Sequence, residues 1–299
     1  MVASILGIIR APFLLLVPAS LAPAFALAWK NSGSIDVPLG ILVFIAALAS
    51  HVAVNALNEY EDFRSGLDFF TQRTAFSGGS GTLVADNRLV PLALYIALIA
   101  LLTTFSIGAY FLLRLGGQIA SALIAPGLLG LAIIVVYTRW LNRFPLLCLF
   151  APGIGFGLLM VNLSVLVLTG AVGLESLWLS LPVTLLVSNL LLVNQFPDIE
   201  ADHRVGRRHL AIAWGVRAAA IAAIALMAAS YVVILAGCLF GLLPAPTLLA
   251  LLTLPLALFV AKKVLAFEIG HTEKLVPGMA ANVALTLLTP LLLALGLMV

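Results

Sequence analysis

The stretch LGILVFIAALASHVAVNALN, residues 39–58, contains no Asp, Glu, Lys or Arg, and the acidic stretch EYEDFRSGLD, residues 59–68, follows it directly. About 20 mostly apolar residues are enough for a helix to cross a bilayer, so residues 39–58 predict a membrane span. The whole chain has the same character, because 63% of its 299 residues are hydrophobic and only 9% are charged. Soluble domains carry roughly 25% charged residues. We therefore expect an integral membrane protein.

Further apolar stretches of similar length occur along the chain, separated by Gly, Pro and short polar connections. The first follows Arg10 and looks partly like a signal peptide, but it is long enough to span a bilayer, and we interpret it as a retained helix. The pattern predicts an all-α fold and a single transmembrane domain over residues 1–299. The nine predicted spans are 8–29, 39–58, 90–113, 118–138, 145–169, 176–196, 215–241, 244–265 and 276–298.

The basic residues predict the orientation of these spans. With a cytoplasmic N-terminus, all of the 15 Lys and Arg residues except Lys30 and Arg114 fall on the inner side. Cytoplasmic loops of membrane proteins carry this excess. The two polar connections, 59–89 and 197–214, would then face the cytoplasm at the cell (inner) membrane. The net charge of +3 gives no reason to expect a nucleic-acid partner.

Acidic residues cluster in the two polar connections. Asn58 and Asp62 are four residues apart, as are Asn194 and Asp198, and residues at this spacing share one helix face. We expect Asp202 to extend the second stripe on one helix, and Gly66 to break the first helix so that Asp68 turns back. The acidic residues of the two segments are Glu59, Glu61, Asp62, Asp68, Asp198, Glu200 and Asp202.

Two facing groups of carboxylates predict a site for a hard divalent cation. Mg²⁺ is commonly bound through carboxylates together with substrate phosphates. Arginines in the same connections could balance the remaining charge of a diphosphate. At the mouth of an apolar helix bundle, this combination suits a hydrocarbon chain that ends in diphosphate. The glycine-rich run Ser77–Gly81 is either a flexible cover over the site or a plain linker.

Both acidic segments resemble a known family. Residues 58–68, NEYEDFRSGLD, resemble the first aspartate motif of the UbiA prenyltransferase superfamily, and residues 194–202, NQFPDIEAD, resemble the second. Residues 206–210, GRRHL, are similar to a Gly-Lys-Arg-Thr-Leu stretch common in that family. The TQRT and SGGSG stretches at 71–74 and 77–81 are most similar to the 1,4-dihydroxy-2-naphthoate polyprenyltransferase branch.

The resemblance implies helices around a central cavity open to lipid, and Mg²⁺-dependent transfer of a polyprenyl group from its diphosphate to an aromatic acceptor. The implied acceptor is 1,4-dihydroxy-2-naphthoate, in menaquinone biosynthesis. The catalytic, metal-binding residues implied are Asp62, Asp68, Asp198 and Asp202, with Asn58 and Glu59 as further metal ligands. The substrate-binding residues implied are Asn58, Arg64, Arg73, Asn194, Arg207 and Tyr137.

Three departures from the family pattern leave alternatives open. Glu59 stands where the family usually has Asp, and Arg207 stands where lysine is usual. The usual Pro-Pro after Tyr137-Thr138 is replaced by the stretch RWLNRFP, residues 139–145. Another aromatic acceptor, such as 4-hydroxybenzoate, therefore stays open, and so does a different class of protein, a transporter with an acidic ion site. The sequence gives no prediction of oligomeric state.

Overall fold

The computed structural model describes residues 1–299, which form helices and no strand. Nine helices are long and apolar enough to cross a membrane, which confirms the predicted fold class and number of spans. The spanning segments are η1 and α2 (Ala11–Leu15 and Leu16–Ser32), α3 (Val37–Ser65), α5 (Val90–Leu115), α6 (Gly117–Val136), α7, η5 and α8 (Pro145–Gly153, Ile154–Leu159 and Met160–Thr169), α9 (Leu174–Asn194), α12 (Val216–Leu239), η6 and α13 (Ala245–Thr253 and Leu254–Leu265), and α14 (Thr272–Met298).

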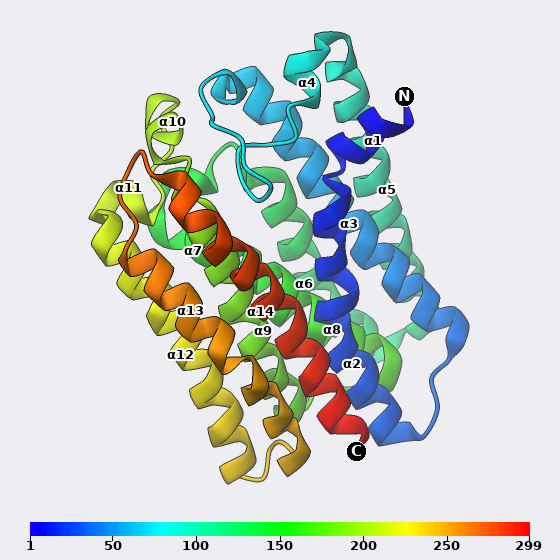
Figure 1. The fold of residues 1–299 in the computed structure, drawn as a ribbon. Helices are drawn as coiled ribbons and strands as arrows, with labels where there is room; N and C mark the ends of the chain where they lie inside the picture. Colours follow the sequence, from blue (N-terminus) through cyan, green and yellow to red (C-terminus); the bar gives the residue numbers. More distant parts are fainter.

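Short helices and loops gather at one end of the bundle. In Figure 1, α1, α4, α10 and α11 lie with the N-terminus at one end, and the C-terminus lies at the other. These connecting elements are α1 (Val2–Ile8), η2 (Leu67–Phe69), α4 (Thr82–Ala85), η3 (Asn87–Leu89), η4 (Leu141–Arg143), α10 (Ile199–Arg204) and α11 (Leu210–Trp214). The two acidic connections therefore meet at the same end, as expected.

Several helix boundaries differ by a few residues from the sequence prediction, and two of these differences affect the site. α3 continues through the acidic stretch to Ser65, seven residues beyond the expected end, and stops at Gly66 with φ of +80°. A left-handed glycine is a common helix terminator because it has no Cβ. The first span begins later than predicted, at Ala11, because Arg10 adopts a left-handed conformation with φ of +49° and separates α1 from η1.

α9 is the most enclosed span, and it packs closely against the helix that precedes it. A Cβ at Gly153 would lie 2.1 Å from Ser188 Oγ, and one at Gly157 would lie 2.0 Å from Thr184 Oγ1. Only glycine allows this approach, which is typical of membrane helix pairs. That preceding span consists of α7 and α8 joined by the π-helix η5. Pro152, near the end of α7, has no N–H to donate.

α6 has the opposite character. Leu123 is its only buried residue, although the helix is 20 residues long. By contrast α9 buries residues on all sides, including Asn189, whose Nδ2 donates to Asn282 Oδ1 of α14 at 2.7 Å. The bundle therefore has a solid half around α9 and α14 and a thin wall at α6.

Candidate active site

The first acidic segment places three carboxylates at the end of α3. Glu59 and Asp62 lie on the last turns of the helix and are buried. The N–H of Gly66 caps α3 by donating to the carbonyls of Asp62 and Phe63. The chain then turns into η2, where Asp68 is also buried. The expected reversal at Gly66 is confirmed.

The second acidic segment does not form the single helical stripe that the spacing suggested. α9 ends at Asn194, and α10 begins after Asp198, whose carbonyl accepts a 2.8 Å hydrogen bond from the N–H of Asp202. Pro197 explains the break, because it lacks an N–H and disfavours helical conformation in the residue before it. Asp198, which caps the N-terminus of α10, and Asp202 within α10 remain one helical turn apart.

Arg207 joins the two acidic segments. Its Nη1 donates to Asp202 Oδ1 at 3.0 Å, and its Nη2 pairs with Asp62 Oδ1, a residue 145 positions away in sequence. Burial opposes the charge of this guanidinium, but Asp62 and Asp202 outweigh it and raise the pKa of Arg207 above its usual value. A cation is therefore already held between the two motifs.

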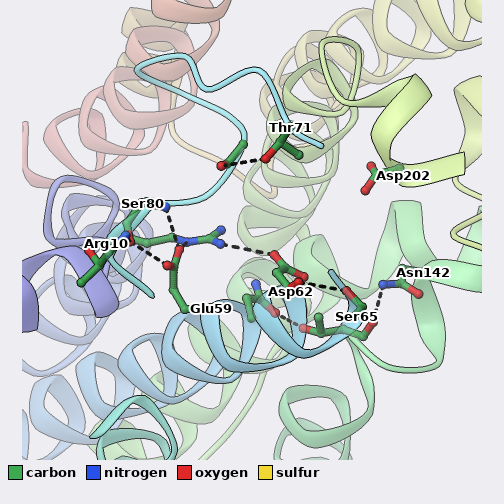
Figure 2. Close-up of polar contacts among 12 residues, drawn as sticks. Arg10, Glu59, Asp62, Ser65, Thr71, Ser80, Asn142 and Asp202 are labelled. Carbon is green, nitrogen blue, oxygen red and sulfur yellow. Dashed lines mark hydrogen bonds and ion pairs between the residues drawn. The ribbon is translucent and has the colours of Figure 1, made fainter. Parts of the chain in front are cut away.

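Arg10 is a second cation in the site that the sequence did not single out. Its Nε donates to Glu59 Oε1 at 2.6 Å, and its Nη2 lies 3.5 Å from Asp62 Oδ2. Figure 2 shows Arg10 between these carboxylates, with Ser80 also joined to Glu59. The Ser80 N–H and Oγ–H donate to Glu59 at 2.9 and 2.6 Å. The fully buried carboxylate of Glu59 therefore accepts three hydrogen bonds.

The glycine-rich run closes over this cluster. Ser77, Gly78 and Gly79 line the same cavity as the aspartates. Gly79 has φ of +70°, and a Cβ there would lie 2.9 Å from Asp68 Oδ1, so glycine lets the backbone approach the carboxylate. Arg73 Nη2 donates to the carbonyl of Asp68 at 3.2 Å. Of the two alternatives for this run, the structure supports the cover.

The cavity has a volume of about 540 Å³ and is lined by both acidic segments at one end and by apolar side chains of α3, α5, α6 and η5 beyond them. Deeper in the cavity, the ring of His51 contacts Phe156 of η5 edge-on, with centroids 4.8 Å apart. A polar mouth that leads to an apolar interior suits a molecule with a charged head and a hydrocarbon tail.

Comparison with known proteins identifies the family. The model of the UbiA prenyltransferase family matches residues 15–274. The chain belongs to this family. A stretch of 208 residues, 66% of the chain, is 32% identical to the 1,4-dihydroxy-2-naphthoate octaprenyltransferase of Bacillus subtilis (strain 168). The match spans 61% of that relative's length.

Solved structures of UbiA homologues share the fold. The apo homologue from Aeropyrum pernix K1 matches with a TM-score of 0.70 at 20% identity, over 95% of each chain. The homologue from Archaeoglobus fulgidus, bound to GPP and Mg²⁺, matches with a TM-score of 0.67 at 12% identity, over 97% of this chain and 99% of that one.

The donor atoms of the UbiA-type motifs fit a hard cation such as Mg²⁺. Three buried oxygens at the cavity mouth have no hydrogen-bond partner: Asp68 Oδ2, Asn194 Oδ1 and Asp198 Oδ1. No three acidic, His or Cys side chains are yet close enough to share one ion, because arginines hold Glu59, Asp62 and Asp202. Unpaired oxygen donors are the ligands Mg²⁺ prefers.

The free aspartates are poised to exchange a proton for a cation. Burial, and next Asp62, raise the pKa of Asp68 to about 7. Burial, and next Asp202, raise the pKa of Asp198 to about 8. Both carboxyls are therefore partly protonated near neutral pH in the metal-free protein, and a bound cation would favour their ionised form.

The remaining predicted residues fall into two groups. Asn58 and Tyr137 line the cavity, where the Thr138 hydroxyl donates to Asn58 Oδ1 and the Tyr137 hydroxyl lies 3.7 Å from Cys148 Sγ. Arg64 is exposed and donates to the Tyr60 hydroxyl at 3.3 Å, outside the cavity lining. Arg73 is likewise outside that lining; its guanidinium lies beside Gly81 of the glycine-rich run and donates to the carbonyl of Asp68.

His209, in the second polar connection, also lies inside the site. Its side chain is 1% exposed, and its Nε2 lies 3.2 Å from Asp202 Oδ2 without the alignment of a hydrogen bond. His209 therefore adds a polar ring, with both nitrogens unpartnered, to the mouth of the cavity.

Proposed function

We propose that this UbiA-family protein transfers a polyprenyl group from polyprenyl diphosphate to an aromatic acceptor, with Mg²⁺ as cofactor and 1,4-dihydroxy-2-naphthoate as the preferred acceptor. The observation that carries the proposal is the meeting of two aspartate motifs at the mouth of one largely apolar cavity. The similarity to a Bacillus subtilis protein named for naphthoate octaprenyl transfer supports the choice of acceptor.

The diphosphate would bind at the mouth of the cavity. Asp62, Asp68, Asp198 and Asp202, with Asn58 and Asn194, are the oxygen donors for the cation. Bound Mg²⁺ would supply positive charge that neutralises the diphosphate and stabilises it as a leaving group. Glu59 differs from these residues, because its carboxylate is already satisfied by Arg10 and Ser80; we assign it to positioning Arg10.

Arg207 and Arg10 provide charge that can be redirected. In the structure they neutralise Asp62, Asp202 and Glu59. With a cation on Asp62 and Asp202, Arg207 and the Nη2 of Arg10 would be available for the diphosphate oxygens, to which arginine binds as a planar fork, while Arg10 Nε would stay on Glu59. Charge on the departing diphosphate grows in the transition state, so these contacts strengthen as the bond breaks.

The apolar interior would protect the reactive carbon. The allylic C–O bond breaks, the diphosphate takes the electron pair, and the allylic cation is attacked by an electron-rich ring carbon. The new C–C bond replaces the ring carboxyl group, which leaves as CO₂ from dihydroxynaphthoate. The cover at Ser77–Gly79 and the apolar walls exclude the water that would otherwise capture the cation. Tyr137 also lines the cavity. Its hydroxyl stays neutral, because burial holds its pKa well above the usual value.

The orientation follows the basic residues. We propose a single catalytic domain in the cell membrane with the N-terminus and both motifs on the cytoplasmic side, where a charged diphosphate can reach them from water. The cavity is lined by helices from both halves of the chain, which supports one functional unit. Membership of the UbiA family argues against the transporter alternative.

The test is transfer by the purified protein in lipid nanodiscs. The protein is given one polyprenyl diphosphate, Mg²⁺, and either 1,4-dihydroxy-2-naphthoate or 4-hydroxybenzoate, and products are identified by mass spectrometry. We expect a prenylated, decarboxylated naphthalene product and little product from 4-hydroxybenzoate. Prenylated 4-hydroxybenzoate as the main product would reassign the acceptor, and ion flux in proteoliposomes without prenyl product would overturn the reaction class.

A further inference from the structure

Two contrasting groups stand out among the helical glycines of this protein. At Gly153, Gly157, Gly237, Gly278 and Gly296, an added Cβ would lie within 2.6 Å of a neighbouring atom. Close packing explains these glycines. At Gly108, Gly127 and Gly155 nothing lies within 4 Å of an added Cβ, and at Gly130 the nearest atom is Leu159 Cδ1 at 3.6 Å.

The second group has no packing or backbone explanation. None of its members has a positive φ, so an alanine would fit each backbone without strain. Glycine inside a helix costs about 1 kcal/mol relative to alanine. All four glycines line the cavity, and therefore the absent side chains leave room in the cavity itself.

Three of these glycines lie on the thin wall formed by α5 and α6. The cavity-facing residues of α6 include no polar side chain: Leu123, Ile124, Gly127, Leu128, Gly130, Leu131, Ile133 and Ile134. The polar side chains deeper in the cavity come from other helices: His51 and Asn55 of α3, Thr104 of α5 and Ser164 of α8. A hydrocarbon chain is the part of the substrate that suits the α6 side.

The glycines stand at successive depths below the site. Tyr137, at the mouth, directly follows α6. With a rise of about 1.5 Å per residue, Gly130 lies about 10 Å and Gly127 about 15 Å from it along the helix axis. Gly108 is eight residues before the turn at Gly116, and Gly127 is eleven after it, which places Gly108 about 5 Å deeper again.

We propose that Gly130, Gly127 and Gly108 form the floor of a groove that receives the prenyl chain of the diphosphate substrate, and that their missing side chains set the length of chain the enzyme accepts. The inference rests on the proposed function, because it names the part of that substrate which the α5–α6 wall holds. A side chain at a given depth blocks only those chains long enough to reach it.

The experiment compares Gly130→Leu, Gly127→Leu and Gly108→Leu with Ala122→Leu, which places the same side chain at an exposed position of α6 outside the cavity lining. Each variant is titrated with geranyl, farnesyl, geranylgeranyl and longer prenyl diphosphates in the presence of Mg²⁺, and binding is measured as protection against thermal unfolding. Transfer to the acceptor is measured in parallel.

The prenyl chain length above which binding is lost should increase in the order Gly130→Leu, Gly127→Leu, Gly108→Leu. Chains beyond that length should lose about tenfold or more in affinity, because displaced methylenes forfeit their burial, while shorter chains bind as in the wild type. Ala122→Leu should match the wild type throughout. Chain-length profiles that are the same in all four variants would overturn the proposal.

Two further measurements separate the possible failures. Gly127→Ala should keep or raise thermal stability without ligand; a clear loss would show that Gly127 serves the helix beside Pro126 rather than the groove. If the wild type binds the series but transfers no prenyl group, the proposed reaction fails while the binding profiles still decide the groove. If it binds no prenyl diphosphate, both fail.

Discussion

Replacing Arg10 by methionine should destabilise the protein, because it leaves the buried carboxylate of Glu59 without its cation. Glu59 is 0% exposed, and it accepts from Arg10 Nε at 2.6 Å. Removing one partner of a buried ion pair costs about 3–5 kcal/mol. Two hydrogen bonds from Ser80 remain, and the Arg10 side chain is 21% exposed, so we expect the lower end, about 3 kcal/mol of unfolding free energy.

The measurement is unfolding of the purified protein in detergent micelles. Lys30→Met is the matched control, because Lys30 and Glu175 form an ion pair of the same 2.6 Å length between side chains that are 36% and 29% exposed. Pairs that are this accessible to water contribute about 0–1 kcal/mol. Arg10→Met should therefore lower stability clearly more than Lys30→Met does.

A double mutant makes the explanation specific. Glu59→Gln removes the buried negative charge, so adding it to Arg10→Met should recover much of the lost stability, with a coupling free energy of about 1–3 kcal/mol. Two results would refute the reasoning: Arg10→Met no less stable than Lys30→Met, or a double mutant no more stable than Arg10→Met alone.

Three further predictions concern the reaction. Asp68→Asn and Asp198→Asn should each lose most turnover while keeping the fold, with non-additive losses when combined, and excess chelator should abolish product formation; steady activity in chelator would exclude a role for Mg²⁺. Arg207→Ala should raise the KM for the prenyl diphosphate, lower kcat, or both, with Arg207→Lys mild and Lys262→Ala silent; wild-type kinetics in all three would reduce Arg207 to an orientation signal. The pKa values of Asp68 and Asp198 are raised to about 7 and about 8, so protons compete with Mg²⁺ for these carboxylates at low pH. Calorimetry should show tighter Mg²⁺ binding and less proton release as pH rises from about 6 to about 9. A Mg²⁺ affinity that does not change with pH would contradict this prediction.

The sequence was sufficient for the fold because the dominant signal is simple. Long apolar runs separated by Gly and Pro locate the spans, and Gly66 marks the end of α3. The repeated Asn-x-x-x-Asp spacing indicated the two segments that form the site. Because these connections follow the second and the sixth span, a chain of antiparallel spans returns both to one end. These features depend on local composition, which is visible without coordinates.

The partners of the charged residues could not be predicted in the same way. Arg10, Arg64, Arg73 and Arg207 look alike as basic residues near membrane ends, but only Arg10 and Arg207 contact the motif carboxylates by side chain. Which arginines reach the carboxylates depends on the left-handed turn at Arg10 and on the break at Pro197, because these two features set the direction of the side chains. Nothing in the local sequence of Arg10 indicates that it meets Glu59 from 49 positions away.

The thin wall at α6 makes the surrounding lipid part of the protein's architecture. With Leu123 as its only buried residue, α6 receives much of its lateral support from acyl chains rather than from other helices. A bilayer whose thickness does not match the helix must be accommodated by tilting or local deformation, and here the element that tilts is one side of the cavity. The width of the cavity, and with it the rate of transfer, should therefore vary with the acyl-chain length of the host lipid more than stability does, because the enclosed half around α9 does not depend on that support.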